Sequence, residues 1–232
     1  MSADGTRLRL YRNPLRLLVS ASPWRAAWYL GGYVFAVGWV LFAAAFTATV
    51  TAAAFAITLA GIPLLIAAAE VLRWCADVER ARLRQVMAAP AGGRYRNAAG
   101  SGLIAQARER WRDPATWRDA AYLIGLWVPL FVLDTAVLAV WLTFLAGVTV
   151  PAWYWAPSGG TRLYVDTLPR ALLAAAIFAV AFLLFNYVVV LTARAHAAVA
   201  RSLLHAPTDP LAEAKEVLAG PGPLGPLHNT FI

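Results

Sequence analysis

The sequence predicts an all-α integral membrane protein in which four transmembrane helices form two helical hairpins of parallel orientation, with both termini cytoplasmic. Three observations support this prediction. Hydrophobic residues make up 61% of the chain and charged residues only 14%, whereas about 25% of residues are charged in soluble domains. Uncharged stretches are long enough to cross a bilayer. A segment of the first half also recurs in the second half.

The first uncharged stretch covers residues 26–69, about twice the roughly 20 residues that span a bilayer. We therefore expect two spans here, near residues 27–46 and 51–72. A tight turn between them is predicted at three polar, β-branched residues that weaken a helix: Thr47, Thr49 and Thr51.

The third and fourth spans are predicted further along the chain. Residues 120–161 contain a single charge, at Asp134, and residues 171–193 contain none. Between them, residues 149–170 are rich in proline and glycine, which interrupt helices. This segment is predicted to form an extracytoplasmic loop.

The distribution of basic residues sets the predicted orientation. The chain has 20 Lys and Arg residues and a formal net charge of +8, and only Arg162 and Arg170 lie in the predicted extracytoplasmic loop. Lys and Arg close to a span favour the cytoplasmic side. The positive charge therefore indicates topology, and the basic residues do not form the stripe that binding to nucleic acid requires.

An internal repeat relates the two halves. Trp24–Gly32 and Trp117–Gly125 are identical at six of nine positions, at a constant offset of 93 residues. Because each half has an even number of predicted spans, both hairpins enter the membrane from the same side. The predicted organisation is a membrane domain (residues 1–205) with repeat one (14–90) and repeat two (107–205), followed by a flexible cytoplasmic tail (206–232).

Few polar side chains fall within the predicted spans. Asp134 lies deep in the third span, where a carboxyl group is costly unless it is neutral, paired or hydrated. It is interpreted either as functional or as a protonated side chain bonded to a neighbouring helix, with Asn186 of the fourth span as a candidate partner. His196 is expected among lipid headgroups. Cys75, the single cysteine, is expected to be a small packing residue.

The extracytoplasmic loop combines aromatic and charged residues. Aromatic side chains at this depth are typical of an interfacial belt, and the alternative is a platform that binds an external ligand. The candidate ligand-binding residues are Trp153, Tyr154, Trp155, Arg162, Tyr164 and Asp166.

The cytoplasmic side offers amphipathic segments. Residues 103–112 place apolar side chains on one face and arginines on others, which is typical of a helix lying on anionic lipid. Residues 6–19 behave similarly. A partner-binding surface is the alternative, with these candidate residues: Trp24, Arg25, Trp111, Trp117 and Arg118.

The stretch Trp111–Leu123 reads Trp-Arg-Asp-Pro-Ala-Thr-Trp-Arg-Asp-Ala-Ala-Tyr-Leu. It resembles the entry motif of the "putative sensor" domain of actinobacterial membrane proteins, which often precedes a histidine kinase. The resemblance extends over roughly residues 14–205 and includes Gly61-Ile62-Pro63 and Pro151–Trp155. It implies a four-helix membrane sensor. The segment after His205 is too short for a kinase domain.

Two functional hypotheses follow. The first is a non-enzymatic sensor that detects an extracytoplasmic or membrane signal and relays it to a separate partner. Apart from the lipid bilayer, the partners expected are a histidine kinase, a regulator, another membrane protein or a second copy of the chain. The alternative is a small transporter or an accessory subunit of a transport complex. No catalytic residues, metal site or cofactor site is predicted, because no nucleophile and base, metal cluster or phosphate loop is recognised.

Overall fold

A computed structural model describes residues 7–58, 60–87, 102–155 and 167–204, and every element in these ranges is helical. The prediction of an all-α fold is thus confirmed. The elements in chain order are α1 (Pro14–Val19), α2 (Ala21–Gly32), η1 (Tyr33–Val37), α3 (Gly38–Ala54), α4 (Gly61–Leu83), α5 (Leu103–Arg112), α6 (Pro114–Ala120), η2 (Ala121–Gly125), α7 (Trp127–Val148), α8 (Val150–Trp153) and α9 (Leu168–Leu204). The segments η1 and η2 are π-helical turns.

Three of the described helices are long and apolar enough to cross a membrane: Ala21–Ala54, Trp127–Val148 and Leu168–Leu204. These lengths are compatible with a membrane protein. The fourth predicted span, residues 51–72, does not form. Its place is taken by α4, which begins only at Gly61 and carries six charged residues in its last 14 positions. The prediction of four clear spans is therefore not met, because too little of α4 is apolar.

The first helical hairpin turns later than the sequence predicted. The three threonines expected in the turn lie within α3, and the chain reverses between Phe55 and Gly61. Threonine weakens a helix by only tenths of a kcal/mol, and contacts with α4 override this. Gly61 is required at the turn, because a β-carbon there would clash with the carbonyl oxygen of Phe55. The hydroxyl of Thr58 donates to the same carbonyl at 2.8 Å.

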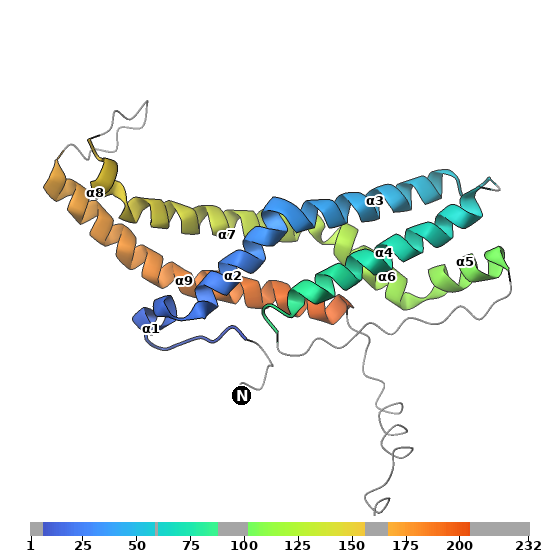
Figure 1. Cartoon of the computed structure of the whole chain (residues 1–232), viewed down its shortest axis with the longest axis horizontal. Helices are drawn as coiled ribbons and strands as arrows, with labels where there is room; N and C mark the ends of the chain where they lie inside the picture. Colours follow the sequence, from blue (N-terminus) through green and yellow to red (C-terminus); the bar gives the residue numbers. More distant parts are fainter. Residues whose placement is uncertain (1–6, 59, 88–101, 156–166, 205–232) are drawn as a thin grey trace, which may run out of the picture.

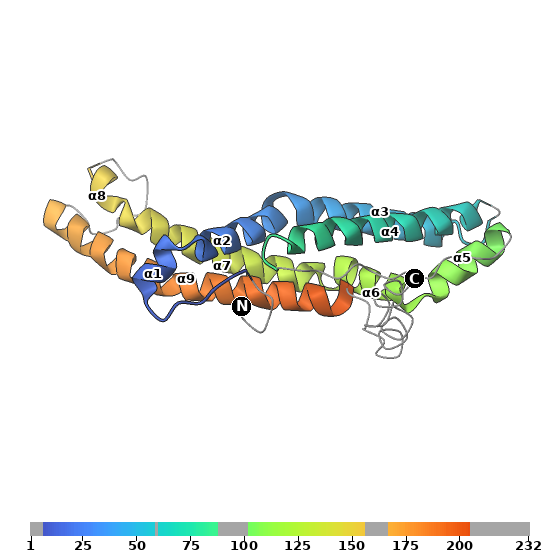
Figure 2. The same cartoon turned by 60° about the horizontal axis from the view of Figure 1, so that its bottom comes forward.

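The two hairpins do not lie side by side in one bundle. Helices α3 and α4 extend toward one end of the longest axis, and α7 and α9 extend toward the other (Figures 1 and 2). The last turns of α4 and α9 lie between the two tips, on the lower side of Figure 1. The two hairpins therefore do not form one four-helix bundle. Helix α4 packs against α3 and also against the shorter helices α5 and α6.

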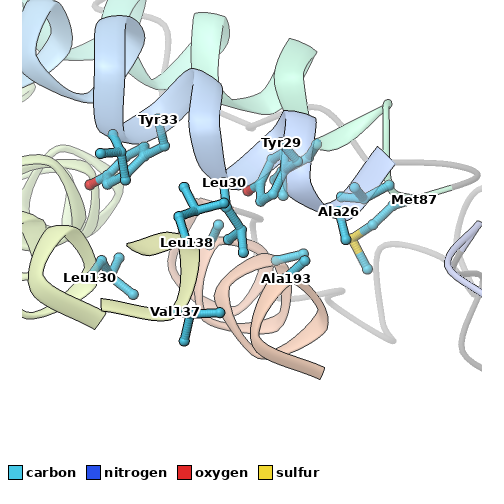
Figure 3. Packing of buried hydrophobic residues seen from close by; sticks show 14 of the residues in the cluster. Ala26, Tyr29, Leu30, Tyr33, Met87, Leu130, Val137, Leu138 and Ala193 are labelled. Atoms are coloured by element: carbon cyan, nitrogen blue, oxygen red, sulfur yellow. The ribbon is translucent and has the colours of Figure 1, made fainter. Parts of the chain in front are cut away.

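The hydrophobic core lies where the bases of the two hairpins meet. Tyr29 and Tyr33, on the first long helix, lie over Leu138 of α7 and Ala193 of α9 (Figure 3). Further along, α7 and α9 approach so closely at Gly147 that a β-carbon would clash with the ring of Phe178. The Gly147 contact joins only α7 and α9, whereas the core residues at the base join the two halves.

The predicted amphipathic segment 103–112 forms the helix α5. It ends at Asp113, whose carboxylate caps the next helix by accepting from the backbone of Ala115 at 2.9 Å. Pro114 occupies the first position of α6, where its missing N–H costs nothing. The sharp break between α5 and α6 thus follows from two adjacent residues.

Candidate functional site

Helix α4 places a buried ion pair at the base of the hairpins. Glu79 Oε2 lies 2.6 Å from Arg82 Nη1, and Arg82 Nη2 donates to the carbonyl of Tyr29 at 2.7 Å. The Glu79 side chain is fully buried and that of Arg82 is 9% exposed. Burial alone would lower the pKa of Arg82, but the Glu79 carboxylate outweighs this and raises it. Arg82 is therefore a permanent cation.

The repeat-related tyrosines meet at this carboxylate. Tyr29 and Tyr122, which occupy equivalent positions in the two repeats, lie with their hydroxyls 3.4 and 3.1 Å from Glu79 Oε1. Both side chains are buried. A single carboxylate in α4 therefore accepts hydrogen bonds from both halves of the molecule.

The polar contacts continue from Tyr122 into α9 and α7. The Tyr122 hydroxyl lies 3.0 Å from His196 Nε2, and His196 Nδ1 lies 2.6 Å from Asp134 Oδ2. Neither the histidine nor the aspartate side chain is exposed. We call the six connected side chains the buried polar network: Tyr29, Glu79, Arg82, Tyr122, Asp134 and His196.

The donors in this network follow from its geometry. Glu79, held by Arg82, is an acceptor, so Tyr122 donates its one proton to Glu79 and must accept from His196. His196 therefore carries a proton on Nε2. A second proton lies between His196 Nδ1 and Asp134 Oδ2, because two bare lone pairs would repel each other at 2.6 Å.

Aromatic rings and π-helical turns surround the network. Tyr33 packs edge-on against the His196 ring at 4.7 Å, and the Arg82 guanidinium lies 4.8 Å from the centre of the Tyr29 ring. Tyr33 begins η1 and Tyr122 lies within η2. π-Helical turns are rare in proteins, and those that do occur often lie at functional sites. Trp127 of α7 donates to the carbonyl of Gly38, just after η1, at 2.9 Å.

A second polar cluster ties down the end of α9. Arg80 of α4 donates to the carbonyl of Leu204 at 2.9 Å, and its guanidinium contacts Asp119 at 3.1 Å and Asp77 at 2.6 Å. Leu204 is the last residue of α9, and Asp119 belongs to α6. One arginine therefore connects α4, α6 and the end of the longest helix.

Two predictions about the intramembrane polar residues are wrong. Asp134 bonds to His196, whereas Asn186 accepts from Trp141 Nε1 at 3.1 Å and donates to the carbonyl of Phe182 at 2.7 Å. His196 is fully buried between Tyr33, Tyr122 and Asp134 and does not lie at the end of its helix. The antiparallel register of α7 and α9 explains both results. It sets Trp141 opposite Asn186 and brings Asp134, two turns earlier, to His196.

The predicted ligand-binding residues are only partly described. Trp153 ends α8 and is 42% exposed, and its indole donates to Thr149 Oγ1 at 3.0 Å. Tyr154 follows it, and Trp155 is exposed. The remaining candidates lie outside the described residues: Arg162, Tyr164 and Asp166. A ligand-binding role for this loop stays a prediction.

The candidate partner-interface residues separate into two groups. Trp111 and Trp117 form an edge-on pair at 5.5 Å, followed in α6 by the half-buried Arg118. Trp24 instead contacts Trp141 of α7, at 5.6 Å, and is followed by the exposed Arg25. Their partner-binding role stays a prediction.

The sequence analysis did not single out Glu79 or Arg82, because both follow the predicted second span. A signal was present in their spacing. Leu72, Cys75 and Glu79 follow one another at intervals of three and four residues, and all three are buried. Glu79 thus continues the buried stripe of α4.

Comparison with known proteins assigns the chain to a family. The family model "Putative sensor" matches residues 32–204, which include five of the six network residues. The chain belongs to this family, as the entry motif indicated. No curated protein and no solved structure matches the chain.

Proposed function

We propose that the chain is a non-enzymatic membrane sensor in the cell membrane, in which the base of the two hairpins changes between two arrangements and α9 relays the change to a separate partner. Family membership supports the sensor role. The observation that carries the proposal is the buried polar network, because it connects both repeats to α9 through side chains that have no access to solvent.

Helix α9 has the properties of a relay. It runs without interruption from Leu168 to Leu204, roughly 55 Å at about 1.5 Å per residue. His196 attaches it to the network, and two turns later Arg80 holds its last carbonyl. A change at the network therefore reaches the start of the tail after only about 12 Å of rigid helix. In the proposed topology this end is cytoplasmic.

The test combines partner recovery with a change at the end of α9. The tagged protein, purified in mild detergent from its native membranes, should retain a histidine kinase or regulator. Truncation after Pro207 should abolish this association. Arg80→Gln, which frees the end of α9, should alter the partner's output. Arg84→Gln is the matched control, because Arg84 directly follows the same helix, is exposed, and should leave that output unchanged.

Two outcomes would count against the proposal. Recovery of transporter subunits would favour the alternative, an accessory role in a transport complex. Recovery of the protein alone, together with specific solute uptake into proteoliposomes, would make it a transporter.

A further inference from the structure

The contact between His196 and Asp134 is unusual because it joins two ionisable side chains inside apolar helices. Its two atoms lie 2.6 Å apart and both side chains are inaccessible. Asp134 belongs to a helix that is apolar enough to cross a membrane, and so does His196. Charged groups in such helices are expensive, and those that occur usually have a functional role.

Asp134 also has an oxygen without a partner. Its Oδ1 atom is buried and makes no hydrogen bond, and the same holds for Oγ1 of the adjacent Thr135. An ionised carboxylate with one oxygen unsolvated is costly, and sharing or binding a proton lowers that cost. The orphaned oxygen therefore indicates a group whose charge is set by a proton.

We propose that His196 and Asp134 form a proton-binding site that switches the base of the hairpins between two arrangements. This inference rests on the proposed sensor function and names its stimulus as a change in proton activity. With the shared proton, the pair is neutral overall and holds α9 against α7. When the proton leaves for solvent, the pair carries one negative charge, two lone pairs face each other, and the contact opens.

The titratable groups around the pair favour its protonated form. Tyr122 of η2 accepts from His196 Nε2, while Tyr29 and Tyr33 of the first long helix present ring contacts. Their hydroxyls are uncharged at neutral pH. From α4, the negative charge of Glu79 is balanced by Arg82. Proton loss would leave an unbalanced negative charge in this surrounding.

The sign of the pH dependence follows. The closed arrangement binds one proton more than the open one, so it is favoured at low pH and lost as pH rises.

Selective ¹⁵N-histidine labelling gives a direct test, because the chain has only three histidines. With His205 and His228, both outside the described residues, replaced by glutamine, His196 is the only imidazole. In detergent or nanodiscs, its Nδ1 proton should be strongly deshielded at about pH 5 and absent at about pH 9. Asp134→Asn should remove the deshielded signal at about pH 5, because the short contact between Nδ1 and a carboxylate oxygen is gone.

Thr135→Val is the matched control. It removes a neighbouring hydroxyl that has no partner, and it should leave the transition unchanged. An Nδ1 proton that persists, or is missing, at every pH in this range would overturn the proton site. So would a deshielded Nδ1 signal that persists in Asp134→Asn. If that variant fails to fold, the wild-type proton signal still decides.

Movement is measured separately. Spin labels at Val132 of α7 and Leu191 of α9, both exposed, would replace the native side chains in a Cys75→Ala background. A longer distance should appear as pH rises, and an unchanged distance would refute the switch.

Both measurements use the isolated protein, so they stand independently of partner recovery. A partner found without titration would overturn this inference and leave the proposed function intact.

Discussion

Helices α4 and α9 are the last helices of repeat one and repeat two, and they differ in how many polar side chains they bury. Helix α4 carries six charged residues within 23 positions, and three of them, Glu79, Arg80 and Arg82, are buried. Helix α9 has 37 residues and buries only two polar side chains, Asn186 and His196. Of these two helices, only α9 is apolar enough to cross a membrane.

The difference shows how many neighbouring elements are needed to supply partners for buried charges. Glu79 takes hydrogen bonds from three elements, and Arg80 reaches two more. Asn186 instead finds its partners on α7 and within α9, and His196 finds its hydrogen-bond partners on α7 and η2. A helix with several buried charges must lie where many elements converge, whereas a helix with isolated polar groups needs only a matched neighbour. Helix α4 therefore marks the base of the molecule.

The largest effect is expected at Glu79, the centre of the α4 network. Glu79→Ala leaves Arg82 buried without its carboxylate and removes the acceptor of Tyr29 and Tyr122. Breaking a buried ion pair in this way costs about 3–5 kcal/mol. The free energy of unfolding in detergent measures it.

Asp77→Ala is the control for that experiment. Asp77 pairs with Arg80 on the same helix, but its side chain is 65% exposed. Its loss should cost less than about 1 kcal/mol. Equal losses for the two variants would show that burial does not distinguish the charges of α4.

A second effect is expected at Cys75, one turn before Glu79. Burial raises the pKa of its thiol to about 11 from 9.0, so the thiolate fraction at neutral pH falls about 100-fold. Alkylation by a membrane-permeant maleimide should therefore be at least that much slower than for a free cysteine. It should accelerate as pH rises toward 11. Mass spectrometry of the intact protein follows the reaction.

The same thiol reports on the packing of α4. In the Glu79→Ala variant Cys75 should react faster, because α4 loses its contacts with both tyrosines, while Asp77→Ala should leave the rate unchanged. Rapid alkylation of the wild-type protein at neutral pH would contradict the tight packing of this helix.

Hydropathy and periodicity predicted the parts of the fold that depend on composition alone. The all-helical class, the amphipathic helix α5 and the repeated tyrosines Tyr29 and Tyr122 were all visible in the sequence. The end of the first span was not visible, because residues 26–69 are uncharged and residues 39–60 contain neither glycine nor proline. There, the position of the turn depends on the packing of α3 against α4.

Predicting the candidate site would have required the register in which α7 packs against α9. Asp134 was recognised as an intramembrane carboxylate, but Asn186 rather than His196 was named as its candidate partner. The pairing of α7 with α9 is antiparallel, and a shift of ten residues separates Asn186 from His196. Glu79 was hidden for another reason: a charged helix next to a span is usually cytoplasmic. Only the three-dimensional arrangement shows that α4 turns this charge inward.

The smallest effect is expected on the α9 side of the comparison. Trp141→Phe keeps an aromatic ring between the helices but removes the indole N–H that Asn186 accepts at 3.1 Å. Hydrogen bonds between membrane helices contribute about 0.6 kcal/mol on average, so the loss should be of that size. A double-mutant cycle with Asn186→Leu isolates the pairwise energy from the change in ring size. A coupling as large as the effect of Glu79→Ala would show that α9 depends on its polar groups as much as α4 does, and the contrast between the two helices would then fail.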